Sequence, residues 1–246
     1  MSQLSSGAAL TVFDEIASTN QEAKKRIEEG ARGPEWVLAR RQTQGYGRRG
    51  RAWEQATGDF SATLLLTPSA PVSRFGELAF VVALAVGAAI EVETAPRAVT
   101  LKWPNDVLVE GAKAAGILIE TAQHADGVSL AIGIGVNIIS VPDDVAYPAT
   151  CISSPDAPPI SPEVLLKRID SHLFAYLKRW ERDGFAPIRS AWMERAAGIG
   201  EPATVNLPAE SLEGVIEGID EHGALLLRLG DETRIIAAAD VFFGAP

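Results

Sequence analysis

Residues 128–138 alternate strictly between two kinds of side chain, and this pattern limits the possible folds more than any other stretch of the chain. Apolar residues occupy the even positions, and the odd positions hold Ser129, Ala131, Gly133, Gly135 and Asn137. Because successive side chains of a strand point to opposite faces, the pattern predicts a β-strand with one apolar face and one nearly bare face. Glycine weakens a strand interior, so the two glycines indicate that either a helix backbone or a flat ligand lies close to this face.

Residues 40–51 form an acid-free segment that contains five arginines and three glycines. The chain as a whole carries a formal net charge of −10. Glycines keep the segment mobile and its like charges repel one another, so we expect a loop that closes over an anion. Two alternatives stay open at this point: a solvated run of charges, or an Arg/Gly segment that binds nucleic acid.

Cysteine content and hydropathy favour a protein of a reducing compartment. Cys151 is the only cysteine, which excludes an intramolecular disulfide. The first residues contain neither a basic leader nor an apolar stretch, so we predict a cytoplasmic location. The longest apolar run, residues 78–90, is shorter than the roughly 20 residues that cross a bilayer. It predicts a buried helix, and no membrane partner is expected.

Charge and histidine positions argue against two other kinds of site. Residues 201–246 contain nine acidic residues against Arg228 and Arg234, so this tail is not expected to bind nucleic acid. His124, His172 and His222 are widely separated, and none has a second metal-type ligand at the spacing of a zinc or iron site. No structural metal is predicted.

The periodicity of the first 200 residues predicts an α/β or α+β fold. Strands are expected at residues 12–14, 36–40, 62–66, 99–103, 107–109, 117–120 and 128–138. Helices are expected from residue 19 to 30, over 75–93, from 161 to about 180 and over 185–197. A turn at Gly111 predicts an antiparallel hairpin between the strands on either side. Five prolines between residues 139 and 160 predict a long loop that could cover a site.

The pattern changes at about residue 200 to short strands, expected at 204–207, 213–220, 224–229 and 233–237. A unit of about 45 residues is near the lower limit for an independent core. We therefore expect a small β-barrel that packs on the main domain. The predicted domains are residues 1–199 and 200–246.

Ser18, Thr19 and Asn20 stand at the start of the first predicted helix, where Thr19 and Glu22 have capping-box spacing. The simplest interpretation is that the three side chains cap the helix. The alternative is that this helix end presents N–H groups and hydroxyls to the polar head of a ligand.

Five motifs resemble, in order and spacing, those of biotin protein ligases. They are Ser18-Thr19-Asn20, Gln42 with residues 45–51, Lys102-Trp103-Pro104-Asn105-Asp106, residues 113–118 and residues 133–137. The arginine string, the Lys-Trp-Pro-Asn-Asp string and the following lysine are together specific to these ligases, and the resemblance covers nearly the whole chain. It implies a class II synthetase-like catalytic domain of the lipoate–biotin ligase type, with a mixed sheet and flanking helices. An SH3-like C-terminal β-barrel is implied to follow it.

The activity that the resemblance implies is a two-step acyl transfer. Biotin and MgATP form biotinyl-5′-AMP, which then acylates a lysine of a biotin carboxyl carrier protein. Biotin and ATP are therefore the expected substrates, with Mg²⁺ as the accompanying ion and no permanently bound cofactor. The carboxylate of biotin and the polyphosphate of ATP repel each other unless cations lie between them. The planar guanidinium of arginine binds the oxygens of either group in pairs.

The resemblance also assigns residues. The residues that it implies for binding biotin are Ser18, Thr19, Asn20, Gln42, Gly45, Tyr46, Gly47, Arg48, Lys113, Gly116, Gly133 and Gly135. Those that it implies for binding ATP and the adenylate are Arg48, Arg49, Arg51, Trp53, Lys102, Asn105 and Asn137. The expected catalytic residues are Arg48, Lys113 and Asp106. Lys113 is expected to reach the carboxylate and the bridging phosphate, although its hairpin position alone would favour a surface lysine.

Asn105 and Asp106 follow Pro104, which places both polar groups at a strand end. Their oxygens are hard ligands of the kind that Mg²⁺ prefers. Asp106 has a second candidate role, as the base that accepts a proton from the carrier lysine. The sequence does not separate these roles.

Position 46 departs from the family pattern, because tyrosine stands where arginine is usual. The loop therefore has one guanidinium fewer, and Tyr46 is expected to pack over bound ligand instead. Arg48 remains the expected clamp.

Other functions remain to be weighed. A lipoate protein ligase shares the fold and the reaction type, but the arginine string argues against it. A non-catalytic RNA-binding module or nucleotide sensor is disfavoured because residues 40–55 offer only Tyr46 and Trp53 as aromatic side chains. The ligase-like pattern begins near residue 11, so neither a DNA-binding domain nor repressor activity is expected. The residues leave open the oligomeric state, a homodimer included, and the identity of the carrier.

Overall fold

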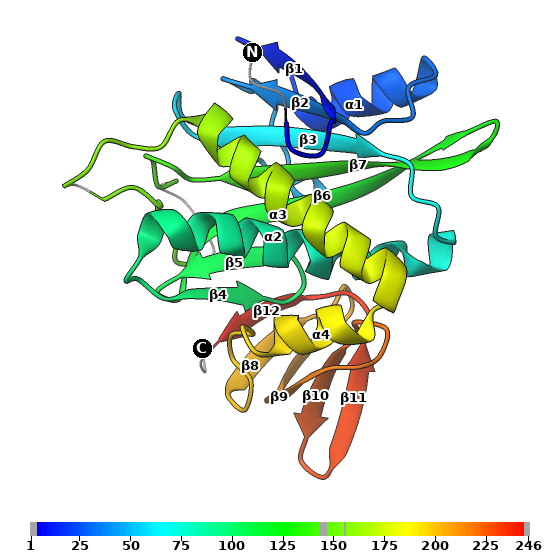
Figure 1. Cartoon of the computed structure of the whole chain (residues 1–246). Helices are drawn as coiled ribbons and strands as arrows, with labels where there is room; N and C mark the ends of the chain where they lie inside the picture. Colours follow the sequence, from blue (N-terminus) through cyan, green and yellow to red (C-terminus); the bar gives the residue numbers. More distant parts are fainter. Residues whose placement is uncertain (1–3, 143–146, 155, 244–246) are drawn as a thin grey trace.

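The computed structural model describes residues 4–142, 147–154 and 156–243. Seven strands form one mixed sheet in the order β1-β2-β3-β7-β6-β5-β4 (Figure 1). They are β1 Ala9–Phe13, β2 Glu35–Ala39, β3 Phe60–Leu66, β4 Val99–Lys102, β5 Asp106–Val109, β6 Ala112–His124 and β7 Gly127–Val136. The β1–β2 pair is parallel and the other neighbouring pairs are antiparallel. The expected mixed sheet is confirmed.

Helices cover both faces of this sheet. Helices α2 (Leu78–Thr94) and α3 (Pro162–Asp183) lie across one face, and α1 (Thr19–Glu28) lies on the other (Figure 1). The alternation within β3 supplies both contacts, because Leu64 joins the large core with α2 whereas Leu65 packs with Ile27 of α1.

Helix α2 is apolar on every side from Leu78 to Ile90. In the described residues, Val72–Thr94 is the one helical segment that is long and apolar enough to cross a membrane, but most of it is buried inside the protein. A helix without a polar face belongs in the centre of a core, which is where α2 lies. The expectation of a buried helix is confirmed.

Several element boundaries differ from those expected, and three of the differences follow from contacts in the structure. Helix α2 begins at Leu78, after the 3₁₀ segment η2 (Val72–Glu77). Strand β6 extends to His124 because β7 provides hydrogen-bonding partners along its whole length. Helix α4 (Ala186–Met193) ends early because the backbone of residues 195–197 pairs with Leu101 of β4 instead.

A five-stranded antiparallel sheet follows, in the order β11-β10-β9-β8-β12. Its strands are β8 Pro202–Asn206, β9 Ser211–Ile219, β10 Leu225–Leu229, β11 Glu232–Ile236 and β12 Asp240–Phe243. The last strand was not expected from the sequence. It pairs with β8, and its Val241 is buried in the same core cluster as the main domain.

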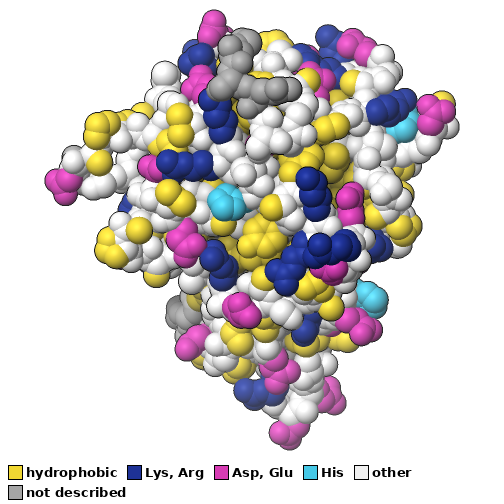
Figure 2. All heavy atoms as spheres, in the orientation of Figure 1, with side chains coloured by type: hydrophobic (Ala, Val, Ile, Leu, Met, Phe, Trp, Pro, Cys, Tyr) yellow, Lys and Arg dark blue, Asp and Glu magenta, His cyan; other side chains and the backbone are white. Residues whose placement is uncertain are grey.

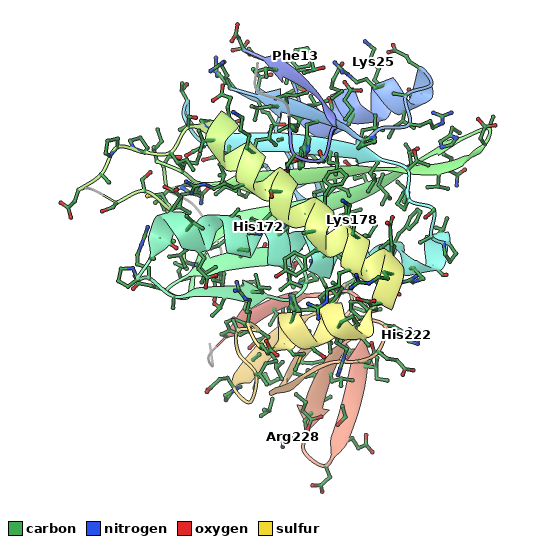
Figure 3. All side chains as sticks on the ribbon, viewed as in Figure 1. Phe13, Lys25, His172, Lys178, His222 and Arg228 are labelled. Atoms are coloured by element: carbon green, nitrogen blue, oxygen red, sulfur yellow. The ribbon has the colours of Figure 1, made fainter. Side chains whose placement is uncertain are left out.

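Polar contacts also join the C-terminal sheet to the main domain, as expected. The indole of Trp103 donates to the carbonyl of Gly223 at 3.0 Å, and Arg189 donates to the carbonyl of Ile219 at 2.9 Å. Figure 2 shows mixed charges on the face that carries α3, with acidic side chains at the lower end of the C-terminal sheet. In Figure 3, His172 and His222 lie apart, on α3 and in the turn between β9 and β10. The described residues contain no group of three or more histidine, cysteine or acidic side chains that would hold a metal ion.

Candidate functional site

A cavity of about 480 Å³ lies where α1, the arginine-rich loop, the middle of the large sheet and strand β12 meet. Most residues that the sequence assigned to a site line this cavity. They are Ser18, Thr19, Asn20, Gln42, Tyr46, Gly47, Arg48, Arg51, Trp53, Lys102, Asn105, Asp106, Lys113, Gly116, Gly133, Gly135 and Asn137. Two predicted residues, Gly45 and Arg49, do not line it.

The two glycines of β7 form the floor of the cavity. A Cβ on Gly133 would lie 2.2 Å from Oδ1 of Asn20, and a Cβ on Gly135 would lie 2.3 Å from the indole of Trp53. Side chains of the cavity wall, rather than a helix backbone, therefore make the close approach that the bare strand face indicated. The helix-backbone interpretation is wrong.

The start of α1 does not use its side chains as caps. Ser18 is the N-cap residue, and it makes no side-chain capping hydrogen bond. The Thr19 hydroxyl and N–H both donate to Oε1 of Gln42, at 3.0 and 2.8 Å. The capping interpretation is therefore wrong, because the polar groups of this helix end are committed to residues across the cavity wall.

A buried hydroxyl of β3 continues this polar wall. Thr63 donates to Oδ1 of Asn20 at 2.6 Å and lies 2.8 Å from the Thr19 hydroxyl. Ser61 lines the cavity two residues earlier on the same strand face, and its buried hydroxyl has no hydrogen-bonding partner in the described part of the chain. One end of the cavity is thus built of neutral hydrogen-bonding groups.

Cations gather at the opposite end. The Nζ atom of Lys113 lies 2.7 Å from Oδ1 of Asp106, and the same Nζ would lie 3.4 Å from a Cβ on Gly116. Lys113 lies on β6, which is two strands away from β3 and its Thr63 in the sheet order β3-β7-β6. The surface-lysine interpretation of Lys113 is wrong, because its side chain turns into the cavity.

Lys102 is more deeply buried, with 5% of its surface exposed. Burial lowers the pKa of Lys102 to about 8, and the nearby carboxylate of Asp106 opposes this shift. Its Nζ lies 3.5 Å from the centre of the Tyr147 ring. An anion that enters the cavity would therefore stabilise the charged form of Lys102.

The arginine-rich loop folds onto the cavity and is not a solvated run of charges. Arg48 donates to Oδ1 of Asn105 at 3.3 Å, and burial lowers its pKa. Arg49 has a left-handed backbone with φ of 57°, and it pairs with Asp240 at 3.0 Å. Arg49 therefore holds the loop in place instead of facing the cavity.

The long loop after β7 covers part of the site, as expected. Pro142, Tyr147 and Ala149 line the cavity. Residues 143–146 and Pro155, which belong to the same predicted loop, lie outside the described residues.

Sequence reasoning missed four residues that build the site. Thr63 and Ser61 were visible only as polar positions in an apolar strand, which is the one signal that could have singled them out. Glu120 was assigned only to a strand, and Asp240 belongs to a strand that was not expected. The roles of Glu120 and Asp240 depend on neighbours far away in the chain.

Asn105 and Asp106 offer two oxygens of the kind that Mg²⁺ prefers. Oδ1 of Asp106 is buried and pairs with Nζ of Lys113 at 2.7 Å. Among the described contacts, Oδ1 of Asn105 accepts only from Arg48, at 3.3 Å. One carboxylate and one amide oxygen fit an ion that takes its other ligands from phosphates and water, as Mg²⁺ usually does.

The arrangement suits an elongated ligand with a neutral polar head and an anionic tail, together with a second anion. The hydroxyl and amide wall would bind the head. Lys102, Lys113 and Arg48 would hold the anionic groups.

Comparisons with known proteins agree with this geometry. Residues 12–137 match the Biotin/lipoate A/B protein ligase family, and residues 198–244 match the Biotin protein ligase C terminal domain. The chain is 41% identical to the biotin–[acetyl-CoA-carboxylase] ligase of Paracoccus denitrificans, over 92% of this chain and 97% of that protein. It is 31% identical to the bifunctional ligase/repressor BirA of Escherichia coli, over 90% of this chain and 70% of that protein.

Solved structures show the same fold. The biotin protein ligase from Aquifex aeolicus in complex with biotin and ATP superposes with a TM-score of 0.85 at 24% identity, over 96% of this chain and 99% of that chain. The apo structure of the Aquifex aeolicus ligase gives a TM-score of 0.78 at 22% identity, with the same coverage.

Proposed function

This chain belongs to the biotin protein ligase family, and from that premise we propose that it forms biotinyl-5′-AMP from biotin and ATP and then transfers the biotinyl group to a lysine of a biotin carboxyl carrier domain. Its enzyme class is that of a biotin–[acetyl-CoA-carboxylase] ligase. The observation that carries the proposal is the polarity of the cavity, with neutral groups at one end and two lysines and an arginine at the other.

In the first step a carboxylate oxygen of biotin attacks the α-phosphorus of ATP, and the bond from that phosphorus to the bridging oxygen breaks to release pyrophosphate. Lys113 and Arg48 would lie between the two anions and offset their repulsion. Lys102 lies beside them in a buried setting, where a bound phosphate would favour its charged form.

In the second step the amine of the carrier lysine attacks the acyl carbon, and AMP leaves with the electron pair of the mixed anhydride. The attacking amine must lose a proton, and Asp106 is the carboxylate that lines the cavity beside Lys113. We assign Asp106 as the proton acceptor, in agreement with its position at the reacting end.

The ring of biotin would occupy the neutral end of the cavity. Ser18, Thr19, Asn20 and Gln42 would face the ureido group, and Gly116, Gly133 and Gly135 would lie under the rings and chain. Tyr46 and Gly47 line the same wall. Trp53, Asn137 and Arg51 also line the cavity. The adenylate would bind beside Trp53 and Asn137, with Arg51 near its phosphate.

Mg²⁺ would be held by Asp106 and Asn105 together with the phosphates of ATP. When bound, the ion would neutralise charge on the polyphosphate.

We place the catalytic domain at residues 1–199 and the C-terminal domain at 200–246, which agrees with the matched ranges. A cytoplasmic location agrees with the single cysteine, Cys151. We expect no repressor activity from this chain, since its net charge of −10 opposes binding to DNA.

Pyrophosphate release on mixing the protein with MgATP tests the first step. We expect release with biotin and none with lipoate or without an acid. Mass spectrometry of a biotin carboxyl carrier domain after the same incubation tests the second step, and a single modified lysine is expected. A gel shift with operator DNA at physiological salt tests the absence of repressor activity.

A further inference from the structure

Glu120 of β6 receives three hydrogen bonds from the wall around the neutral end of the cavity. The Tyr46 hydroxyl donates to its Oε2 at 2.7 Å, and Nδ2 of Asn20 donates to the same oxygen at 2.8 Å. Lys24 of α1 donates to Oε1 at 2.8 Å. Asn20 and Tyr46 line the cavity, whereas Glu120 does not. One carboxylate thus joins the helix start, the arginine-rich loop and the sheet.

The protonation states of these groups suit this contact. Burial raises the pKa of Glu120, but the hydrogen bonds from Lys24, Asn20 and Tyr46 outweigh burial, so its pKa lies below the ordinary value. Burial and the bond to Glu120 raise the pKa of Tyr46, so the phenol keeps its proton. Glu120 is therefore an ionised acceptor, and Tyr46 a neutral donor, at neutral pH.

Glu120 also determines which way Asn20 faces. An ionised carboxylate only accepts, so Asn20 must turn its Nδ2 towards Glu120. Its Oδ1 is then left to accept from Thr63, as the 2.6 Å contact shows. The amide therefore presents a defined pattern of donor and acceptor to the cavity.

We propose that Glu120 is a positioning residue that assembles the ring-binding half of the site before substrate arrives. It fastens Tyr46, and with it the first half of the arginine-rich loop, and it orients Asn20. The second half of the loop is held separately, by Asp240. Tyrosine at position 46 thus keeps the loop fixed without a guanidinium. The proposal rests on the proposed function, because it assumes that biotin occupies this end.

The kinetic consequence is specific. Loosening the ring-binding half of the site lowers the fraction of protein in which this pocket is assembled. The apparent affinity for biotin falls in proportion to that fraction. Interactions far from the reacting atoms contribute equally to ground and transition states, so kcat should stay unchanged. The KM for ATP should stay unchanged as well, since Lys102, Lys113 and Arg48 are untouched.

Tyr46→Phe and Glu120→Gln test the proposal in the pyrophosphate-release assay. Tyr46→Phe removes one hydrogen bond to a charged group, and we expect the KM for biotin to rise about 5- to 10-fold. Glu120→Gln should raise it further, because Asn20 also loses its fixed orientation. The double variant should be no worse than Glu120→Gln alone, since both changes break one shared contact.

Two variants serve as matched controls. Glu35→Gln breaks the contacts of another partly buried glutamate, which accepts from Arg26 and Thr11 and has 18% of its side chain exposed against 25% for Glu120. Tyr176→Phe removes another partly buried tyrosine hydroxyl, on α3. Neither residue lines the cavity, so both should keep the wild-type KM for biotin even where stability changes.

The proposal is overturned if Tyr46→Phe and Glu120→Gln keep the wild-type KM for biotin. It is also overturned if their effects multiply in the double variant, or if kcat and both KM values shift together in these variants. Failure of the proposed function has a different signature, because wild-type protein would then release no pyrophosphate with biotin.

Discussion

The guanidinium of Arg51 lies 2.9 Å from Oδ1 of Asp240, and this contact joins the arginine-rich loop to the last strand of the C-terminal sheet. Arg49 pairs with the other oxygen of the same carboxylate at 3.0 Å. The side chains of Arg49 and Arg51 are 42% and 55% exposed, so each pair contributes roughly 1 kcal/mol or less. The loop is therefore held weakly at this point.

Asp240→Asn should loosen the second half of the loop without unfolding the protein. We expect trypsin to cleave after the arginines of residues 48–51 about threefold faster or more, because cleavage follows the open population. Peptide mass spectrometry over time measures this. Glu217→Gln, which breaks an exposed pair with Arg228 on the same sheet, should leave the cleavage rate unchanged. Equal rates in wild type and Asp240→Asn would show that the contact does not hold the loop.

Arg48→Gly should let the reactive intermediate escape. Arg48 is the partly buried arginine of the loop that lines the cavity, and its loss is expected to open the cavity to water at the anhydride. We expect biotinyl-5′-AMP to appear free in solution and affinity for ATP to fall roughly tenfold, as for a lost charge-assisted contact. Chromatography of the reaction mixture detects the adenylate. Arg41→Gly is the control, because Arg41 is exposed and pairs only with Glu15 among the described contacts. An Arg48→Gly protein that retains its adenylate and binds ATP normally would refute the role of clamp.

ATP binding at pH 8 should be accompanied by uptake of a proton at Lys102. Its pKa of about 8 leaves the unliganded lysine about half charged at this pH, and a bound anion raises the pKa. We expect an uptake approaching roughly 0.5 proton per site at pH 8 and almost none at pH 6.5. Calorimetry in buffers of different ionisation enthalpy measures it. Lys102→Met should abolish the proton uptake. If the uptake persists in that variant, a group other than Lys102 takes up the proton.

The same lysine predicts how stability changes with pH. An unfolded lysine has a pKa near 10.5, so between about pH 8 and 10.5 the unfolded chain binds more protons than the folded one. The contribution of Lys102 to stability therefore increases as the pH rises through this window. Below pH 8 its buried charge costs up to roughly 3 kcal/mol. Lys102→Met should consequently raise the unfolding free energy at pH 7 in urea titrations, and by less at pH 10. A variant that is less stable at pH 7 would contradict this.

Ser61→Ala should stabilise the unliganded protein. The Ser61 hydroxyl is buried without a hydrogen-bonding partner in the described part of the chain, and such a group costs about 1 kcal/mol or more. Removing it relieves this cost and leaves only a small void. The unfolding free energy measured in urea should therefore increase by about 1 kcal/mol. A decrease would show that the hydroxyl is satisfied in solution. Ser153→Ala offers a comparison, because Ser153 also has a buried unpaired hydroxyl but does not line the cavity.

Strand β7 illustrates what local pattern can predict. Its alternation follows directly from which side chains are buried, so the strand and its bare face were readable from residues 128–138. The motif residues were readable for the same kind of reason, because their types and spacing are local. Most of them line one cavity, although they come from widely separated segments.

The start of α1 illustrates where local pattern fails. Spacing alone cannot distinguish a Thr19 hydroxyl that caps its own helix from one that donates to Gln42, 23 positions away. Glu120 and Asp240 are ordinary acidic residues in the sequence, and only their distant neighbours give them a role. Strand β12 was missed because four residues are too few to show a periodic pattern. This segment is a strand because it pairs with β8.

By itself the sequence determined the kinds of elements, the buried central helix and the residues that carry the chemistry, since these depend on side-chain type and on spacing within one element. Only the tertiary structure decided which polar groups bond to one another and which acids hold the arginine-rich loop. The physical reason is that a hydrogen bond or an ion pair depends on distance and direction in space, and contacts such as that of Arg51 with Asp240 join residues 189 positions apart.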